Sequence, residues 1–165
     1  MNTPICDFVR EYVAAAPIRL HMPGHKGQGT LGEPFDITEI PGADSLYQAD
    51  GIIRQSEENA GQLFGAATFY STEGSSQCIR AMLYLACLQA KRQGRLPRIA
   101  AGRNAHKAFL SAAALLNVDL LWLSSSADSY LSCNITPAEL EQTLINAHPR
   151  PTAVYLTSPD YLGNT

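Results

Sequence analysis

One short stretch of the chain combines a glycine with two hydroxyl side chains just before a long apolar run. Gly74 has no Cβ, so a ligand can approach its backbone closely, and Ser75 and Ser76 add two hydroxyl groups at the start of a predicted helix. The unpaired amides at the start of a helix attract anions, so this turn is a candidate phosphate site. The alternative is that Ser75 only caps the helix, as serines commonly do.

The histidines offer further chemical possibilities. His21 and His25 lie four residues apart, a spacing that brings two metal ligands together only on a helix, and the intervening Pro23-Gly24 disfavours a helix. We therefore predict no metal site there, and an ordinary turn with a solvated His25 and Lys26 is a simple alternative. His106 lies at a predicted strand-to-helix junction, where the simplest role of an imidazole is to hydrogen-bond the helix backbone.

Several acidic and hydroxyl side chains complete the set of candidates. The segment 17–50 is rich in Pro, Gly and Asp and too long for a passive connector, and its acids include Asp36, Glu39, Asp44 and Asp50. Near the mouth of an active site, such carboxylates would attract a cationic substrate, although scattered loop acids are more often simply solvated. Two residues after the last predicted strand either face a ligand or build a Ser-Pro turn, and they are Ser158 and Tyr161.

Composition limits the classes of protein to consider. With 165 residues, 45% of them hydrophobic, the chain can bury the core of one ordinary domain, and its net charge of −3 gives no reason to expect nucleic acid or an anionic membrane as a partner. The basic stretch 91–98 is interpreted as a solvated helix terminus rather than a phosphate-binding patch, because cations there complement the helix dipole. No segment approaches the ~20 apolar residues that span a bilayer, and the amino terminus lacks a signal-peptide layout, so we expect a cytoplasmic protein. The scattered cysteines are interpreted as buried or incidental thiols.

Two hydrophobic periodicities define the elements that must position these residues. A short amphipathic helix is predicted at 4–16. Further helices are predicted at 52–64, 75–93, 105–116 and 137–147, and strands at 68–71, 98–101, 118–124 and 152–157. This alternation predicts parallel βαβ units in an α/β domain, where ligands gather at the junctions between strand carboxyl ends and helix starts. The Gly74 turn, His106 and Tyr161 fall at or next to such junctions.

Six short blocks stand in an order that resembles the amino-terminal part of the Orn/Lys/Arg decarboxylases. They are 21–27 (HMPGHKG), 36–39 (DITE), 41–53 (PGADSLYQADGII), 70–76 (YSTEGSS), 103–107 (RNAHK) and 157–163 (TSPDYLG). The resemblance covers nearly the whole chain from about Arg19 onward and is to the compact members of the family, which lack an N-terminal receiver-like domain. It implies the aspartate-aminotransferase fold, pyridoxal 5′-phosphate as cofactor, a basic amino acid as substrate and a place in polyamine metabolism.

The resemblance also implies roles for individual residues. Gly74, Ser75 and Ser76 would hold the cofactor phosphate, His106 would stack on the pyridine ring, and Ser158 would face the cofactor. The residues implied to shape the substrate entrance or a subunit interface are His25, Lys26, Asp36, Glu39, Asp44 and Tyr161. Glu73 departs from the neutral residue usual in the family, and a carboxylate beside a phosphate is repulsive unless it points away or is neutralised.

Two groups that the cofactor needs are expected outside this chain. The family's Schiff-base lysine and the aspartate that pairs with the ring nitrogen lie in later blocks, and Lys107 is interpreted as a surface lysine or one just outside the site. We therefore expect an amino-terminal fragment, with residues 1–50 as a helix and interface loops and residues 51–165 as the first part of the large domain. Alone, it should bind the cofactor weakly, lack activity and form dimers or higher oligomers.

Two alternatives stay open. The chain could be a non-catalytic interaction or regulatory module that kept the fold, an idea to which the unusual Glu73 and Asp160 lend some support. It could also be another pyridoxal enzyme of the same fold, such as an aminotransferase or a β-eliminating lyase, which blocks 21–27 and 41–53 disfavour. The residues do not choose among lysine, arginine and ornithine, because the deciding pocket depends on later residues or on a second subunit.

Overall fold

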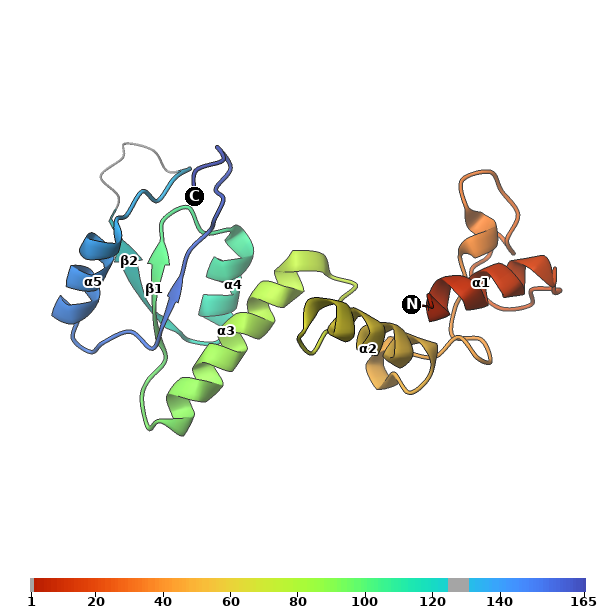
Figure 1. Cartoon of the computed structure of the whole chain (residues 1–165), viewed down its shortest axis with the longest axis horizontal. Coiled ribbons are helices and arrows are strands. Elements are labelled where there is room, and N and C mark those ends of the chain that lie inside the picture. Colours follow the sequence, from red (N-terminus) through yellow and green to blue (C-terminus); the bar gives the residue numbers. More distant parts are fainter. Residues whose placement is uncertain (1, 125–130) are drawn as a thin grey trace. The chain divides into compact units, whose positions relative to one another are not determined.

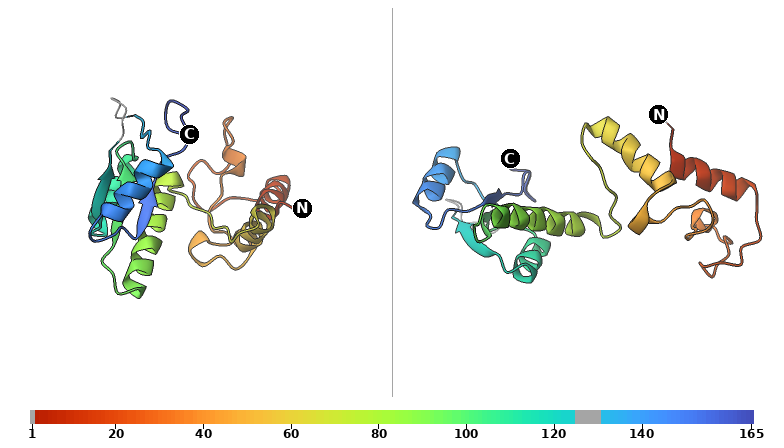
Figure 2. Two further views of the ribbon diagram at one scale, coloured as in Figure 1. Left: turned by 60° about the vertical axis from the view of Figure 1, so that its left-hand side comes forward. Right: turned by 90° about the horizontal axis from the view of Figure 1, so that it is seen from below.

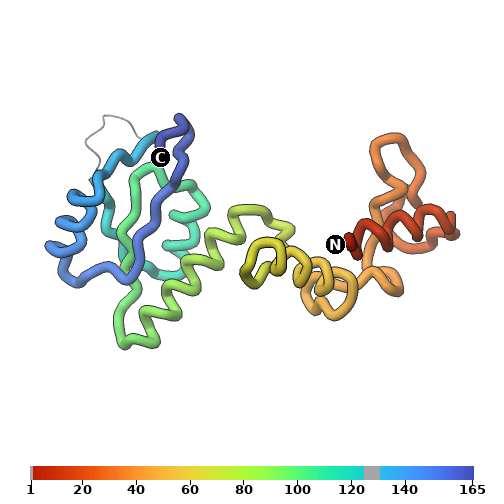
Figure 3. The backbone as a smooth tube through the Cα atoms, viewed as in Figure 1, coloured from red at the N-terminus to blue at the C-terminus, as the bar shows by residue number. Residues whose placement is uncertain are grey.

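The computed structural model describes residues 2–124 and 131–165, which fall into two compact units, Met1–Tyr70 and Ser71–Thr165. The backbone of each unit can be followed in Figures 1 and 3. The sequence predicted a domain boundary after residue 50. The two compact units of the structure meet after Tyr70 instead, because α2 (Ile52–Phe64) packs against α1 (Pro4–Ala14) and so belongs to the first unit. The predicted division concerns the domains of a complete enzyme and stays a prediction.

The first unit is built from two helices and a long loop that folds beside them. Pro4 occupies the first turn of α1, where its missing N–H is not needed, and the helix ends two residues before the predicted limit. Helix α2 has the predicted bounds and ends at Gly65, whose φ of +66° places it in the left-handed region that favours glycine. Two short 3-10 helices, Glu33–Phe35 and Leu46–Gln48, interrupt the loop.

The strand predicted at 68–71 is wrong. Those residues belong to no strand, and the N–H of Tyr70 donates to the carboxylate of Glu57 at 2.7 Å instead of to a neighbouring strand. The phenol of Tyr70 also donates to the backbone oxygen of Ser56 at 3.1 Å. β-forming residues make a strand only where another backbone pairs with them, and none of the described residues does so here.

The second unit is a three-stranded parallel sheet with helices on both faces. Helix α3 (Gly74–Arg92) precedes β1 (Arg98–Gly102), followed by α4 (Lys107–Leu115), β2 (Asp119–Leu123), α5 (Pro137–Asn146) and β3 (Ala153–Tyr155). The strand order is β2-β1-β3, and Ala100 of β1 pairs with Leu121 on one side and Val154 on the other. The predicted parallel βαβ arrangement is therefore confirmed, with β2 and β3 shorter than predicted.

The helices divide between the two faces as right-handed crossovers require. Strands β2 and β3 flank β1 on opposite sides, so the crossovers through α4 and α5 lie on opposite faces of the sheet (Figures 1 and 2). On the α4 face, Ile99 packs with Leu83 of α3 and with Phe109 of α4, whose ring stacks on Tyr155 with centroids 4.3 Å apart. The crevice beyond the carboxyl ends of β1 and β3 is the place where such sheets bind ligands.

Local sequence signals explain where α5 begins. Thr136 accepts a hydrogen bond from the Glu139 N–H at 3.3 Å, and the Glu139 carboxylate accepts one from the Thr136 N–H at 2.8 Å. This reciprocal capping box, with Pro137 in the first turn, fixes the start of the helix.

None of the helices within residues 2–124 and 131–165 has the length and apolar character needed to cross a bilayer.

Candidate functional site

A pocket of about 360 Å³ opens at the carboxyl ends of β1 and β3. The turn between β1 and α4 supplies most of its wall, and two later segments close it through Leu131 and Tyr161. The residues contributed by the turn are Arg103, Asn104, Ala105, His106 and Lys107. Five kinds of polar side chain, a guanidinium, an amide, an imidazole, an ammonium group and a phenol, therefore meet at the sheet edge where ligand sites are expected.

His106 caps helix α4. Its backbone is extended (φ −60°, ψ 148°), and its Nδ1 accepts a hydrogen bond from the N–H of Ala108 at 3.1 Å. An imidazole that accepts through Nδ1 carries its proton on Nε2, which remains available as a donor. The simple alternative, a histidine bonded to the helix backbone, is the geometry observed, and this bond orients the half-buried ring at the pocket wall. Stacking on a cofactor ring stays a prediction.

Asn104 is a pocket residue that the sequence reasoning did not single out. Its side chain is only 8% exposed, and its Nδ2 donates a long bond of 3.5 Å to the backbone oxygen of Leu131. Its Oδ1 is buried and accepts no hydrogen bond from any described residue. A buried acceptor without a partner costs free energy, so it marks a position where a donor from a ligand or a water molecule would be stabilising.

Gly102 makes room for that amide. A Cβ built on Gly102 would lie 2.9 Å from the Oδ1 of Asn104 and 3.1 Å from the Cβ of Cys133. Any larger residue would displace the amide or the cysteine, so glycine is needed for a close approach of side chains to the last residue of β1. A glycine at a strand end followed by a polar residue was the sequence signal that could have revealed Asn104.

The turn at the start of α3 differs in one respect from the expectation. The helix begins at Gly74, with Glu73 in the capping position and no side chain capping the helix, so the alternative that Ser75 caps it is wrong. Gly74 has φ +61°, and a Cβ there would meet no atom within 4 Å, which leaves its backbone open to an approaching group. Ser75 is exposed and Ser76 half-buried.

Arg80 neutralises the carboxylate of Glu73, which would otherwise repel a phosphate at the start of α3. Its Nη1 donates to the Glu73 Oε2 at 2.6 Å and lies 3.1 Å from the side-chain oxygen of Gln77. The acid at the start of α3 is therefore paired with a cation on the same helix. That is one of the two conditions under which a phosphate could bind beside it.

Of the predicted cofactor residues, only His106 lines the pocket, together with the predicted entrance residue Tyr161. Gly74, Ser75, Ser76 and Ser158 are not among its lining residues. The amino-terminal end of α4 lies at the edge formed by the strand carboxyl ends, whereas α3 begins to the side of the sheet, beyond α4 (Figure 1). Ser158 is exposed and precedes a cis proline.

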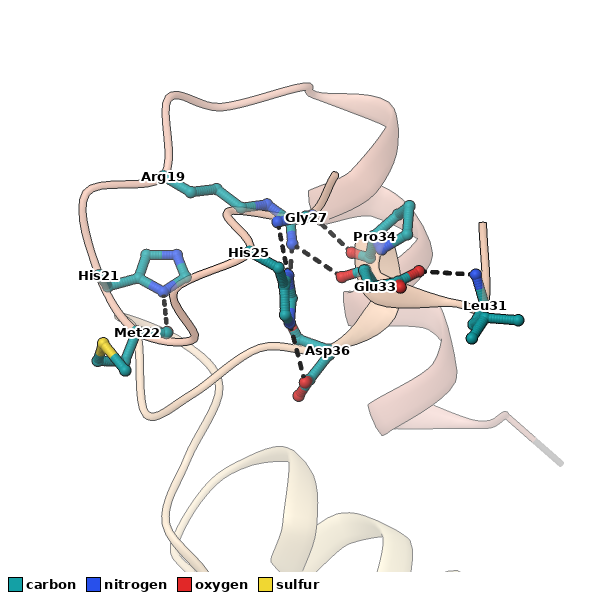
Figure 4. A network of polar contacts seen from close by, with 9 residues as sticks. All are labelled: Arg19, His21, Met22, His25, Gly27, Leu31, Glu33, Pro34 and Asp36. Atoms are coloured by element: carbon teal, nitrogen blue, oxygen red, sulfur yellow. Dashed lines mark hydrogen bonds and ion pairs between the residues drawn. The ribbon is translucent and has the colours of Figure 1, made fainter. Parts of the chain in front are cut away.

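Two of the predicted entrance residues in the first unit, His25 and Asp36, belong to a local polar network (Figure 4). The Nε2 of His25 lies 3.1 Å from the Asp36 carboxylate, and its Nδ1 accepts from the Gly27 N–H at 2.9 Å. Arg19 donates to the backbone oxygen of Pro34 at 2.5 Å, and Lys26 to that of His21 at 2.6 Å. These bonds close a compact loop. Within the described residues, no group of three His, Cys, Asp or Glu side chains is placed to hold a metal ion.

Asp44 has a structural task that the sequence did not reveal. Its carboxylate accepts hydrogen bonds from the N–H groups of Ser45, Asp50, Gly51 and Ile53, at 2.8, 3.1, 2.9 and 2.9 Å. Partial burial raises the pKa of Asp44, but these four bonds favour the charged form more strongly, so the pKa lies well below its ordinary value. The carboxylate ties the loop to the start of α2. Glu39 accepts from the Ser45 hydroxyl at 2.8 Å.

Comparison with known proteins identifies the family. A family model described as "Orn/Lys/Arg decarboxylase, major domain" matches residues 3–164. The chain belongs to the Orn/Lys/Arg decarboxylase family. Arginine decarboxylases of Bacillus subtilis and of Halalkalibacterium halodurans are each 29% identical to this chain over 98% of its length and 34% of theirs. This member of the Orn/Lys/Arg decarboxylase family thus spans about a third of the length of the curated relatives it matches.

A solved structure confirms the fold class. "Lysine decarboxylase A from Pseudomonas aeruginosa" superposes with a TM-score of 0.60 and 19% sequence identity, covering 86% of this chain and 21% of that one. The resemblance in fold therefore extends over most of the present chain and about a fifth of the lysine decarboxylase. The expected α/β architecture with a mainly parallel sheet and flanking helices is therefore confirmed.

Proposed function

We propose that this chain supplies the phosphate-binding and ring-contacting half of a pyridoxal 5′-phosphate site in a decarboxylase of basic amino acids. The observation that carries the proposal is the pocket at the carboxyl ends of β1 and β3, where His106 caps α4 and Asn104 has a buried Oδ1 to which no described residue donates. Family membership supports the reaction class. The proposal also includes a cytoplasmic protein that assembles as a dimer or higher oligomer.

The residues present fit a flat aromatic ring that carries a phosphate. The pocket offers an imidazole and a phenol, with Arg103 and Lys107 giving it a positive wall, and the Oδ1 of Asn104 is buried behind that lining. The start of α3 offers an open glycine backbone and two hydroxyls, with the Glu73 charge compensated by Arg80. When bound, pyridoxal 5′-phosphate supplies an electron sink for the loss of carbon dioxide from an amino acid.

Each residue has a defined task in this proposal. The amides and hydroxyls of Gly74, Ser75 and Ser76 bind the phosphate. The hydrogen bond from Ala108 holds the His106 ring in one orientation, so that it contacts the pyridine ring and donates through Nε2. Ser158 lies on the loop after β3 and adds a hydroxyl at the same edge of the sheet. His25, Lys26, Asp36, Glu39, Asp44 and Tyr161 are proposed to belong to the entrance or to a subunit interface.

We further propose that a polypeptide of these 165 residues does not decarboxylate. Lys107 contributes the single ammonium group among the lining residues of the described pocket, and its side chain is exposed at the start of α4. None of those lining residues carries a carboxylate that could pair with a ring nitrogen. In this proposal the described pocket therefore holds no acidic partner for the ring, and Lys107 is not its covalent anchor.

The names of the curated relatives guide the choice of substrate. Both relatives described above are named arginine decarboxylase, whereas the solved structure is named lysine decarboxylase. Arginine is therefore the first amino acid to test with the complete gene product, with lysine and ornithine as comparisons.

Binding of pyridoxine 5′-phosphate tests the proposal directly. This analogue has the ring and the phosphate but no aldehyde, so it cannot react with lysines. Equilibrium dialysis should show weak, saturable binding that His106→Ala reduces and Lys91→Ala, at the far end of α3, does not. With pyridoxal 5′-phosphate and borohydride, peptide mapping should find labelling scattered over Lys26, Lys91 and Lys107. Stoichiometric labelling of Lys107 with release of carbon dioxide would contradict the proposed inactivity.

A non-catalytic module is the second candidate. The two residues that depart from the family blocks are both accommodated by the fold, since Glu73 is paired with Arg80 and Asp160 is buried in a hydrogen-bonded turn. A fold that tolerates changes within the family blocks is what such a module requires. Absence of any saturable binding of pyridoxine 5′-phosphate would favour this candidate over the half-site.

A further inference from the structure

A buried carboxylate lies just beyond β3, outside every helix and strand. Asp160 is 8% exposed, and both of its oxygens accept hydrogen bonds. Its Oδ1 accepts from the N–H groups of Leu162 and Asn164 at 2.8 and 2.9 Å, and its Oδ2 accepts from the Nδ2 of Asn164 at 2.9 Å. A charge that is buried and fully hydrogen-bonded holds its surroundings in one arrangement, because breaking any bond leaves it unsatisfied.

The backbone of the same turn closes around this carboxylate. The Asp160 N–H donates to the Asn164 oxygen at 2.9 Å, and the Gly163 N–H donates to the Asp160 oxygen at 3.1 Å. The amide of Asn164 lowers the pKa of Asp160 most, partial burial opposes this, and the net result is a pKa of about 2. Asp160 is therefore charged throughout the neutral range, and the turn does not loosen with ordinary changes of pH.

The turn is also tied to a segment distant in sequence. The Nδ2 of Asn164 donates to the Ser132 hydroxyl at 3.2 Å, and the neighbouring Leu131 accepts from Asn104 through its backbone oxygen. Leu131 and Tyr161 are the two residues that close the pocket opposite the turn bearing His106. One set of polar contacts around Asp160 thus connects both segments that form the far wall.

We propose that Asp160 is a positioning residue, which holds Tyr161 and Leu131 against the pocket so that they retain a planar phosphorylated ligand beside His106. The proposal rests on the proposed function for the identity of the ligand. Tyr161 is 72% exposed, so the described residues cover only a small part of its ring at the pocket rim. The turn that Asp160 organises therefore determines where that ring lies.

The first test separates positioning from general stability. Dissociation constants for pyridoxine 5′-phosphate are measured for the wild type, Asp160→Ala, Tyr161→Ala and the double variant, with urea unfolding on each. We expect Asp160→Ala to weaken binding on the order of tenfold, the size of one lost buried hydrogen-bond partner. In the Tyr161→Ala background, the same change should add a smaller loss of affinity than it does in the wild type, because only the contribution through Leu131 remains. If the fold-increases in dissociation constant of the two single variants multiply in the double variant, the two residues act independently and the proposal is overturned.

A matched control removes an acid at the other end of the sheet. Asp119 pairs with Arg98 at 3.0 Å at the amino ends of β2 and β1. Asp119→Asn should change stability without changing the dissociation constant. Ser132→Ala removes one hydroxyl that contacts Asn164 and helps to lower the pKa of Asp160, and it leaves the bonds within the turn, so its effect on affinity should be smaller than that of Asp160→Ala.

A second readout does not depend on the ligand. In protein labelled with 3-fluorotyrosine, the Tyr161 signal is assigned with Tyr161→Phe and then compared between the wild type and Asp160→Asn. We expect that signal to narrow and move toward its unfolded position in Asp160→Asn, while the Tyr155 signal in the core stays in place. An unchanged Tyr161 signal would overturn the positioning role. If the wild type binds no pyridoxine 5′-phosphate, the proposed function fails, and the fluorine signal still decides the role of Asp160.

Discussion

The guanidinium of Arg80 pairs with the carboxylate of Glu73 at 2.6 Å, across the first two turns of α3. Both side chains are about half exposed, at 42% and 58%, so the pair contributes little to stability. Its importance is electrostatic and local. Glu73 stands where the proposed phosphate site needs a neutral or positive surrounding, and Arg80 cancels its charge on the same helix.

We predict that Arg80→Ala weakens binding of pyridoxine 5′-phosphate about threefold, because it leaves an uncompensated carboxylate at the start of α3. Glu73→Gln should bind at least as tightly as the wild type, and the double variant should recover the wild-type affinity. Dialysis at low and high salt measures this, and the differences should shrink at high salt. Arg92→Ala, at the last turn of the same helix, is the control. If Arg80→Ala binds as the wild type does even at low salt, the compensation does not matter.

Asp44 should make the first unit sensitive to acid. The pKa of Asp44 is lower in the folded protein than in the unfolded chain, so its contribution is fully present above the unfolded value of about 3.9 and is lost as the pH falls through the folded value. Asp44→Asn should lower the thermal midpoint at pH 7 and flatten its decline in acid, as followed by circular dichroism. The exposed Asp50→Asn should do neither. An equal acid response in Asp44→Asn and wild type would contradict this assignment.

Phe109 should be a principal determinant of stability in the second unit. Its side chain is 0% exposed and stacks on Tyr155 in the core. Phe109→Ala should reduce the free energy of unfolding by about 3–5 kcal/mol, because it leaves a cavity that the sheet cannot fill. Leu110→Ala, next in sequence but 45% exposed, should cost much less. Urea unfolding of both variants measures the difference, and comparable losses would show that the core lies elsewhere.

Self-association is expected from the two edges of the sheet. Among the described residues, β2 and β3 each pair with β1 alone, so one edge of each strand is open. Open edges with apolar neighbours such as Val154, 41% exposed, favour association. Light scattering at tens of micromolar should therefore report dimers or larger species, and Val154→Lys should shift the population toward monomer. A monomeric wild type under these conditions would refute the prediction.

The sequence alone determined the types of most elements and the family. Helix α2 was predicted with its observed bounds, because an apolar period of 3.6 and a following glycine are local signals. The alternation of helices and strands was enough to predict a parallel sheet, since a parallel connection needs a crossover. The strand expected at 68–71 did not form. Strand formation depends on a pairing partner, which local composition does not specify.

Only the tertiary structure decided which polar residues work together. Asn104 reaches Leu131 across 27 positions, and Asn164 reaches Ser132 across 32, distances in sequence at which no periodic pattern links two residues. Asp44 and Asp160 look like ordinary loop acids in the sequence, and their tasks follow from backbone amides that gather around them once the loops have closed. Periodicity records which face of an element is buried. It carries no record of which side chains from separate loops meet, because those contacts are set by how the elements pack and not by their spacing along the chain.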